Sequence, residues 1–175
     1  MNREEFAKAA RAGQTVWVGG AYDALSAKLI EEAGMSAIMT TGFGVSASHL
    51  GAPDLELYTM TENLAVVRNI VNAVDAPVIA DTDTGYGNAL NVMRTVREFE
   101  AAGVAAMIFE DQESPKKCPA AANKIEILEI QESIGKIRAA VEARKNPDVL
   151  IIARTDATTE DEAIERGKAY AEAGA

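Results

Sequence analysis

The chain has 175 residues, enough for one domain with a hydrophobic core, and its 48% apolar and 25% charged residues are ordinary for a globular protein. The net charge of −10 argues against nucleic acid as a partner, and no apolar run reaches the roughly 18 residues of a membrane span. One cysteine cannot form an internal disulfide and the first residues do not resemble a signal peptide, so we expect a cytoplasmic protein.

Short β-rich segments alternate with amphipathic helices along the chain. The predicted strands are 15–19, 37–41, 77–80, 105–109 and 149–153, and the predicted helices are 24–33, 61–74, 89–102, 133–144 and 160–173. Apolar residues at helical spacing and capping-box pairs, such as Thr59 with Glu62, support the helices. This alternation predicts right-handed βαβ units and a parallel sheet, either an open doubly wound sheet or a (β/α)8 barrel.

The number of βα units bears on the choice between these architectures. No G-x-G-x-x-G sequence follows the first strand and no Walker loop is present, which removes the simplest nucleotide-binding interpretations. A (β/α)8 barrel usually takes about 250 residues. We therefore expect residues 1–175 to form a single barrel domain, truncated after about five βα units, that corresponds to the N-terminal two-thirds of a (β/α)8 TIM barrel.

Acidic residues collect where ligands bind in both architectures, at the carboxyl ends of the strands. Asp81 and Asp83 follow the third predicted strand, Glu110 the fourth and Asp156 the fifth. Residues i and i+2 of a strand point to the same side, which predicts that Asp81 and Asp83 lie together. Several carboxylates at one mouth favour Mg²⁺ or Mn²⁺ over zinc, which prefers His and Cys ligands.

A loop after the fourth strand, 114–119 (SPKKCP), carries the second candidate. Two neighbouring lysines favour the thiolate of Cys118, which makes it a candidate nucleophile or proton donor. A half-buried structural cysteine beside two solvated lysines is the commoner interpretation of this pattern. In the same way, Asp54 fits a helix cap or turn, and His49 fits a solvated loop residue.

With these motifs in place, the segment from residue 22 to residue 173 resembles the isocitrate lyase/phosphoenolpyruvate mutase superfamily, close to its 2-methylisocitrate lyase-like enzymes. The matching motifs are 21–27 (AYDALSA), 81–87 (DTDTGYG), 110–112 (EDQ), 116–118 (KKC) and 153–157 (ARTDA). Their order and spacing together are specific, although none is decisive singly.

The resemblance implies a (β/α)8 barrel that assembles as a homotetramer of dimers, which exchange a C-terminal helix located beyond residue 175. It implies a magnesium ion held, directly or through water, by Asp81, Asp83 and Glu110, with Asp54 as an outer acid. It also implies a small α-oxo or hydroxy carboxylate as the substrate. The substrate contacts would come from Tyr22, Thr41, Gly42, Phe43, Lys124 and Arg154, and the catalytic residues would be Cys118 as proton donor, Arg154 and Lys117.

The implied reaction is Mg²⁺-dependent cleavage of a substituted malate or 2-methylisocitrate-like acid to pyruvate, or a related α-oxo acid, and a second carboxylate. The chain departs from the family where Pro119 and Ala120 replace the Gly-His of the lyase flap. This replacement favours a substrate that is smaller or less polar at its far end. The alternatives are an oxaloacetate hydrolase or decarboxylase, a phosphorylmutase of the carboxyvinyl-carboxyphosphonate type, and a non-catalytic metabolite-binding homologue.

Overall fold

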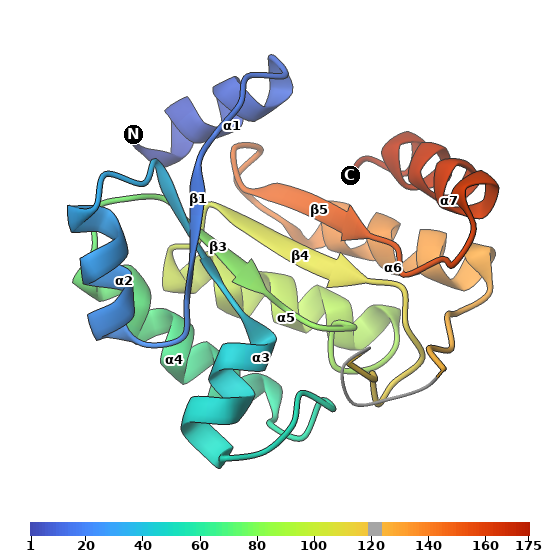
Figure 1. The fold of residues 1–175 in the computed structure, drawn as a ribbon. Coiled ribbons are helices and arrows are strands. Elements are labelled where there is room, and N and C mark those ends of the chain that lie inside the picture. The colour runs from blue at the N-terminus through green and yellow to red at the C-terminus, as the bar shows by residue number, and fades with distance from the viewer. Residues whose placement is uncertain (119–123) are drawn as a thin grey trace.

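A computed structural model describes residues 1–118 and 124–175, and its central feature is a parallel sheet (Figure 1). The strands of this sheet lie in the order β1-β2-β3-β4-β5, and each pairs in parallel with its sequence neighbour. Their bounds are Val18–Ala21, Ala37–Thr40, Val78–Asp81, Ala106–Glu110 and Leu150–Arg154. A strictly sequential order is that of a β/α barrel, because a doubly wound sheet reverses its strand order at a switch point. The predicted parallel α/β architecture is therefore confirmed, and the order favours the barrel type.

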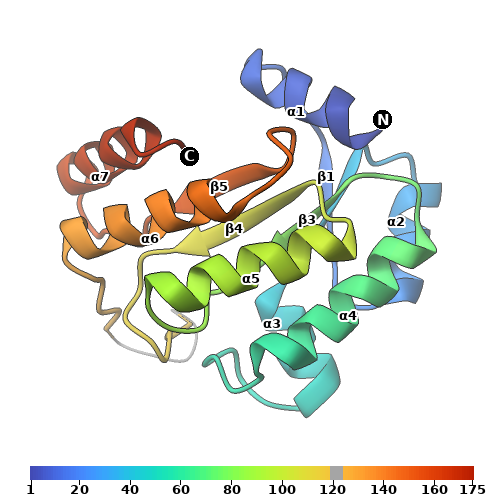
Figure 2. The ribbon, with the colours of Figure 1, turned by 180° about the vertical axis from the view of Figure 1, so that it is seen from behind.

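The helices form a layer on one face of the sheet. Figure 2 shows α4, α5 and α6 in front of the strands, while α1 lies across the end where the strands begin. The helices are α1 (Arg3–Arg11), α2 (Ala24–Glu32), α3 (Gly42–Val45), the π-helical turn η1 (Ser46–Leu50), α4 (Met60–Ala73), α5 (Ala89–Ala102), α6 (Ile130–Ala143) and α7 (Glu160–Glu172). Within the described ranges, none of them is both long enough and apolar enough to cross a bilayer.

The largest differences from the predicted elements lie in the first 50 residues. Helix α1 was not predicted, although Asn2 and Glu5 form a reciprocal capping box at its start. Strand β1 begins at Val18, three residues later than predicted, and Trp17 beside it is 72% exposed. The short helices α3 and η1 were also missed, because neither is long enough to show a helical period.

Alternation along the strands separates the two faces of the sheet. In β4, Met107 and Phe109 belong to the main core against the helices, whereas Ala106 belongs to a second cluster on the inner face. Phe6 of α1 packs into that second cluster, together with Ile79 of β3. Apolar side chains, including one from α1, thus pack on the inner face where the strands begin.

Candidate active site at the carboxyl ends of the strands

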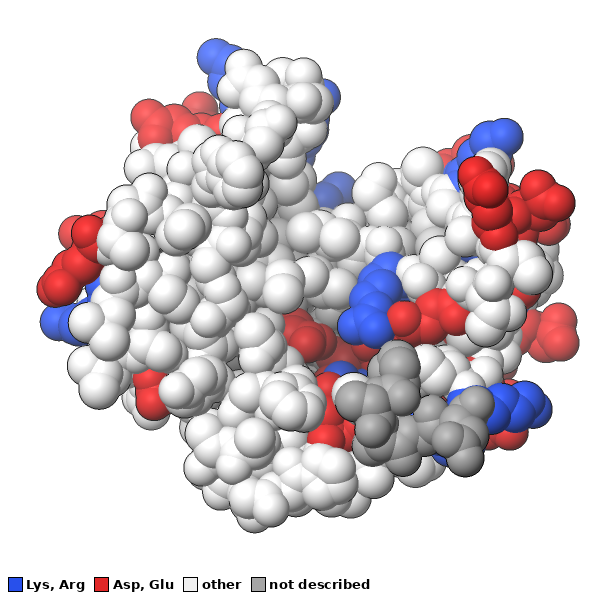
Figure 3. All heavy atoms as spheres, in the orientation of Figure 1, with Lys and Arg blue, Asp and Glu red and all other residues white. Residues whose placement is uncertain are grey.

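Three predicted site residues are the last residues of neighbouring strands. Asp81 ends β3, Glu110 ends β4 and Arg154 ends β5, with Glu110 directly paired with Arg154 in the ladder. Two residues earlier in β3, Ile79 lies in the inner cluster, so Asp81 shares its face. By the same alternation, Glu110 and Arg154 also point to the inner face. Figure 3 shows acidic and basic side chains gathered in a hollow in the middle of this face.

This hollow is a pocket of about 260 Å³. It brings together most of the residues that the sequence singled out, from five different segments of the chain. The lining residues that are polar, or that the sequence analysis named as site residues, are Thr41, Gly42, Phe43, Asp54, Asp81, Glu110, Gln112, Lys116, Lys117, Cys118 and Arg154. The site is therefore assembled by the sheet, because parallel strands deliver their carboxyl ends to one edge.

Asp83 reaches the site by a different route from the one predicted. Strand β3 ends at Asp81, and Asp83 has a left-handed φ of 50°, so strand alternation does not extend to it. The backbone N–H of Asp83 instead donates to Asp81 Oδ1 at 3.1 Å. Asp83 is completely buried, and its Oδ2 accepts a hydrogen bond of 3.1 Å from the Tyr86 hydroxyl. A tight turn, rather than the strand, places the second aspartate beside the first.

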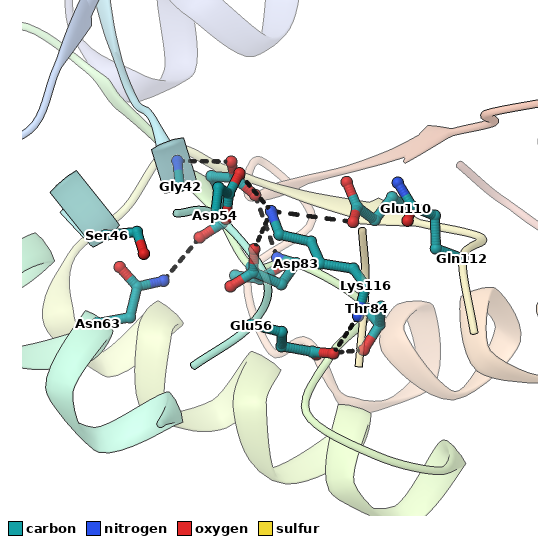
Figure 4. Close-up of polar contacts among 12 residues, drawn as sticks. Gly42, Ser46, Asp54, Glu56, Asn63, Asp83, Thr84, Glu110, Gln112 and Lys116 are labelled. Carbon is teal, nitrogen blue, oxygen red and sulfur yellow. Dashed lines mark hydrogen bonds and ion pairs between the residues drawn. The ribbon is translucent and has the colours of Figure 1, made fainter. Parts of the chain in front are cut away.

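The ammonium group of Lys116 lies among the buried acids (Figure 4). Its Nζ contacts Asp83 Oδ1, lies 3.1 Å from Asp54 Oδ2 and lies 3.9 Å from Glu110 Oε1. Burial by itself lowers the pKa of Lys116, but the negative charges of Asp83, Asp81 and Glu110 outweigh it and raise the pKa. Sequence reasoning missed this role. Its only signal was the position of Lys116 in the Lys-Lys-Cys motif.

Glu56 is a second residue that sequence reasoning missed. Its carboxylate accepts hydrogen bonds from Thr84 Oγ1 at 2.6 Å and the Lys116 backbone N–H at 2.9 Å (Figure 4), and a third from Ser114 Oγ at 2.8 Å. These partners belong to the loops after β3 and β4. Glu56 therefore fixes the start of the 114–118 segment against the floor of the pocket, which helps to aim Lys116 inward.

Burial shifts the protonation of two acids in the cluster. Loss of solvent and the charge of Asp81 raise the pKa of Asp83 to about 6, although Lys116 opposes the shift. Loss of solvent also raises the pKa of Glu110 to about 8, against the opposing charges of Lys116 and Arg154. The cluster therefore holds protons at a pH where exposed carboxylates are ionised.

These shifts predict how stability depends on pH without metal. The folded protein binds more protons than the unfolded chain between the usual pKa of 4.5 and the raised pKa of about 8 for Glu110. This contribution to stability is complete below the unfolded pKa and is lost as the pH rises through the folded pKa. In EDTA, the free energy of unfolding measured in urea should fall from pH 5 to pH 8, by less in a Glu110→Gln variant. The same change at exposed Glu113 is the control, and an equal fall in all three proteins would contradict the prediction.

The carboxylates have the chemistry of a site for a hard divalent cation. In the part of the chain that the structure describes, Asp54 Oδ1 and Glu110 Oε1 are buried without a hydrogen-bond partner. Such oxygens are the ligands that Mg²⁺ and Mn²⁺ prefer. Among the same described residues, no three acidic, histidine or cysteine side chains form a preformed metal cage. The carboxylate oxygens are thus of the type that binds a divalent metal. In this arrangement, however, the positive charge among them is the ammonium of Lys116.

The remaining predicted residues lie at the edge of the site or outside it. Lys117 and half-buried Cys118 line the pocket, but Lys117 Nζ pairs with Glu126 Oε2 at 2.6 Å. Tyr22 and Lys124 are not among the residues that line the pocket, and the Lys124 side chain is 80% exposed. The roles predicted for these two side chains stay predictions. The Pro119 and Ala120 replacement lies outside the described residues.

Comparisons with known proteins agree on one family. The family model described as phosphoenolpyruvate phosphomutase matches residues 6–175. The chain is 58% identical to 2,3-dimethylmalate lyase of Eubacterium barkeri over 159 residues, which cover 89% of this chain and 55% of that protein. The chain thus spans about half the length of this curated relative.

Solved structures show the same fold at high similarity. The crystal structure of a phosphoenolpyruvate phosphomutase from Streptomyces platensis subsp. rosaceus superposes with a TM-score of 0.95 at 43% identity, covering all of this chain and 62% of that one. A phosphonopyruvate hydrolase in complex with oxalate and Mg²⁺ superposes with a TM-score of 0.90 at 39% identity, covering all of this chain and 61% of that one.

Proposed function

This chain belongs to the phosphoenolpyruvate phosphomutase family, within the isocitrate lyase/phosphoenolpyruvate mutase superfamily, and from that premise we propose that the complete protein is a Mg²⁺-dependent carbon–carbon lyase. The family is the one that the sequence motifs indicated. The proposed substrate is a substituted malate or a 2-methylisocitrate-like acid. Its cleavage yields pyruvate, or a related α-oxo acid, and a second carboxylate. The high identity to a 2,3-dimethylmalate lyase supports this class of substrate.

The observation that carries the proposal is the composition of the pocket at the strand ends. One hollow contains the carboxylates of Asp81 and Glu110, the guanidinium of Arg154, the ammonium of Lys116 and the thiol of Cys118. Cations and metal-binding acids side by side suit an anionic substrate rich in oxygen. In a chain with a net charge of −10, such a substrate requires locally placed positive charge.

Asp81, Asp83 and Glu110 are the proposed ligands for Mg²⁺ or Mn²⁺, with Asp54 as an outer acid. When bound, the ion would neutralise negative charge that develops on substrate oxygens during bond cleavage. The buried oxygens of Asp54 and Glu110 that have no hydrogen-bond partner among the described residues support this assignment. The oxalate and Mg²⁺ in the similar phosphonopyruvate hydrolase support it as well, and they suggest oxalate as a binding probe for this protein.

Arg154 and the start of α3 are proposed to hold the substrate carboxylates. The Arg154 side chain is 43% exposed and faces the pocket. Gly42 comes close to three site atoms, because a Cβ there would meet Tyr58 Oη at 2.9 Å and both Asp81 Oδ2 and Lys116 Nζ at 3.0 Å. A glycine is therefore needed at this wall, where the N–H of Gly42 donates to Asp81 Oδ2 at 2.9 Å. Thr41 and Phe43, with Tyr22 and Lys124 further out, are the other proposed contacts.

Cys118 is proposed as the acid that protonates the departing product. Cleavage leaves a carbanion beside a carboxylate, and the half-buried thiol lines the same pocket. The ammonium groups of both neighbouring lysines pair with carboxylates, Lys116 with Asp83 and Lys117 with Glu126. Both lysines are thus engaged in ion pairs, and the thiol is the group of this segment proposed to meet the carbanion.

Proton NMR on the complete protein tests the proposal. The substrate panel is 2,3-dimethylmalate, 2-methylmalate, 2-methylisocitrate and oxaloacetate, each with Mg²⁺ and then with EDTA. We expect pyruvate from a substituted malate, with loss of product in EDTA and in an Asp81→Asn variant. Turnover of oxaloacetate alone would replace the lyase with a hydrolase or decarboxylase. Silence across the panel, with oxalate still bound, would indicate a metabolite-binding homologue.

Phosphonate chemistry is the second candidate function. The similarity to a phosphoenolpyruvate phosphomutase and to a phosphonopyruvate hydrolase favours it. Cys118 argues against it, because the flap of the phosphonomutases usually lacks this cysteine. Phosphorus NMR with phosphonopyruvate separates the two candidates, since a lyase leaves the carbon–phosphorus bond intact. For the complete protein we also propose one catalytic barrel domain, a cytoplasmic location and a homotetramer, as the resemblance implies.

A further inference from the structure

Gln112 connects two loops of the site that are far apart in sequence. It follows β4, and its side chain is completely buried. Its Nε2 donates to Asp156 Oδ2 at 2.7 Å, in the loop after β5. Its Oε1 accepts a hydrogen bond of 2.8 Å from the backbone N–H of Lys117, the residue before Cys118. One amide therefore joins the loop after β5 to the segment that carries the thiol.

The contact with Asp156 continues to the guanidinium of Arg154. Asp156 Oδ1 accepts from Arg154 Nε at 3.2 Å and from Nη2 at 2.7 Å. On its other side, Arg154 Nη1 lies 3.1 Å from Glu110 Oε2. The second oxygen of Asp156 is the one that Gln112 binds. A continuous row of hydrogen bonds thus runs from Arg154 through Asp156 and Gln112 to the backbone of Lys117.

The chemistry at the two ends of Gln112 requires a neutral amide. The carboxylate of Asp156 can only accept hydrogen bonds, and the backbone N–H of Lys117 can only donate one. A glutamine offers one donor group and one acceptor, so the partners determine which end of the amide faces which loop. A glutamate here would face a second carboxylate in a buried place, and a methionine would make neither bond.

We propose that Gln112 is a positioning residue that holds the carboxylate-binding Arg154 and the segment bearing Cys118 in one fixed relative geometry. This inference rests on the roles proposed above for Arg154 and Cys118. Gln112 can serve in this way because its own backbone is held by an antiparallel bridge to Ile127. A displacement of about 1 Å between reacting groups can cost on the order of 10²-fold in rate, so a buried bridge between two loops at the pocket wall can affect turnover through the residues that it holds in place.

The test is a charge-conserving exchange of the two side chains in the complete protein. In a Gln112→Glu variant, two carboxylates face each other, and we expect kcat/KM to fall on the order of 10²-fold. In an Asp156→Asn variant, the new side chain has one acceptor oxygen in place of two. Its NH2 group must therefore face either the NH2 group of Gln112 or the guanidinium of Arg154, one hydrogen-bonded contact is lost, and activity should also fall. In the Gln112→Glu/Asp156→Asn double variant, the new asparagine donates to the new glutamate and still accepts from Arg154, and the new glutamate accepts from Lys117. The double variant should recover most of the lost activity.

Two comparisons separate positioning from a purely structural role. A Gln131→Glu variant makes the same chemical change at an exposed site of α6 and should keep the wild-type kcat/KM. If Gln112 only stabilised the fold, the single variants would unfold at lower urea but keep the turnover of each folded molecule. That result, or a double variant no better than the Gln112→Glu variant, would overturn the inference.

A second measurement keeps this inference distinct from the proposed function. If the wild-type protein turns over no substrate of the panel, the lyase proposal fails, and the same four proteins are compared by their Kd for oxalate with Mg²⁺. Weaker oxalate binding in both single variants, restored in the double variant, would still support the bridge. Failure of the double variant to restore that binding would overturn it.

Discussion

Replacing Lys116 with methionine should lower the free energy of unfolding of the metal-free protein by about 3–5 kcal/mol, the usual cost of breaking a buried ion pair. The ammonium of Lys116 contacts Asp83 and Asp54 and the Lys116 side chain is 4% exposed, so the variant leaves these acids buried without their cation. They must then take up protons or draw in water. Urea unfolding at pH 8 in EDTA measures the loss.

The neighbouring lysine provides a matched control. The Lys117 side chain is 41% exposed and pairs with Glu126, which is also partly exposed. Exposed ion pairs are worth at most about 1 kcal/mol, so Lys117→Met should change the stability little. Equal losses in the two variants would mean that the acids around Lys116 are not a coupled buried cluster.

Magnesium should then stabilise the Lys116→Met variant more than it stabilises the wild-type protein. A divalent ion held by Asp81, Asp83 and Glu110 would replace the lost positive charge. A ligand that binds only the folded state raises stability according to its concentration and affinity, so a titration of unfolding against Mg²⁺ reports the effect. No extra stabilisation in the variant would contradict the proposed ligands, whatever the outcome of the activity assays.

In the complete protein, with Cys118 as the proposed general acid, replacing Cys118 with serine should reduce the kcat of the proposed lyase reaction by about 10²–10⁴-fold, the range for loss of such a group. Serine keeps nearly the same shape, but an alcohol holds its proton far more tightly than a thiol does. Because Cys118 is not among the proposed metal ligands, the variant should bind oxalate and Mg²⁺ with the wild-type Kd. NMR assays give kcat, and calorimetry gives the Kd.

The combination of these two readouts decides the role of Cys118. Loss of turnover with unchanged oxalate binding supports a proton donor. Loss of both would mean that Cys118 shapes the pocket instead, and unchanged turnover would mean that the proton comes from another group. The Cys118→Ser substitution leaves both side chains of the neighbouring Lys117–Glu126 pair unchanged, so a difference in turnover should come from the thiol itself.

Much of the fold follows from local pattern. The helix predicted at 89–102 matches α5 (Ala89–Ala102) at both ends, because Asn88 caps its start and Gly103 takes a left-handed conformation after its end. The strand predicted at 37–41 differs from β2 by one residue, since a short apolar run between polar residues suits a buried parallel strand. Strand β1 was misplaced because it lies at the edge of the sheet and exposes Val18, so its burial pattern is weaker.

The sequence by itself determined the α/β class, the alternation of the five strands with the main helices and the edge of the sheet where the polar residues collect, because propensity, periodicity and strand ends are properties of neighbouring residues. Only the tertiary structure decided that Lys116 turns into the acid cluster while Lys117 turns toward Glu126, and that Gln112 joins Lys117 to Asp156. These choices depend on partners tens of residues away. They are set by the cost of burying a charge or an amide without a partner, and no local pattern records that cost.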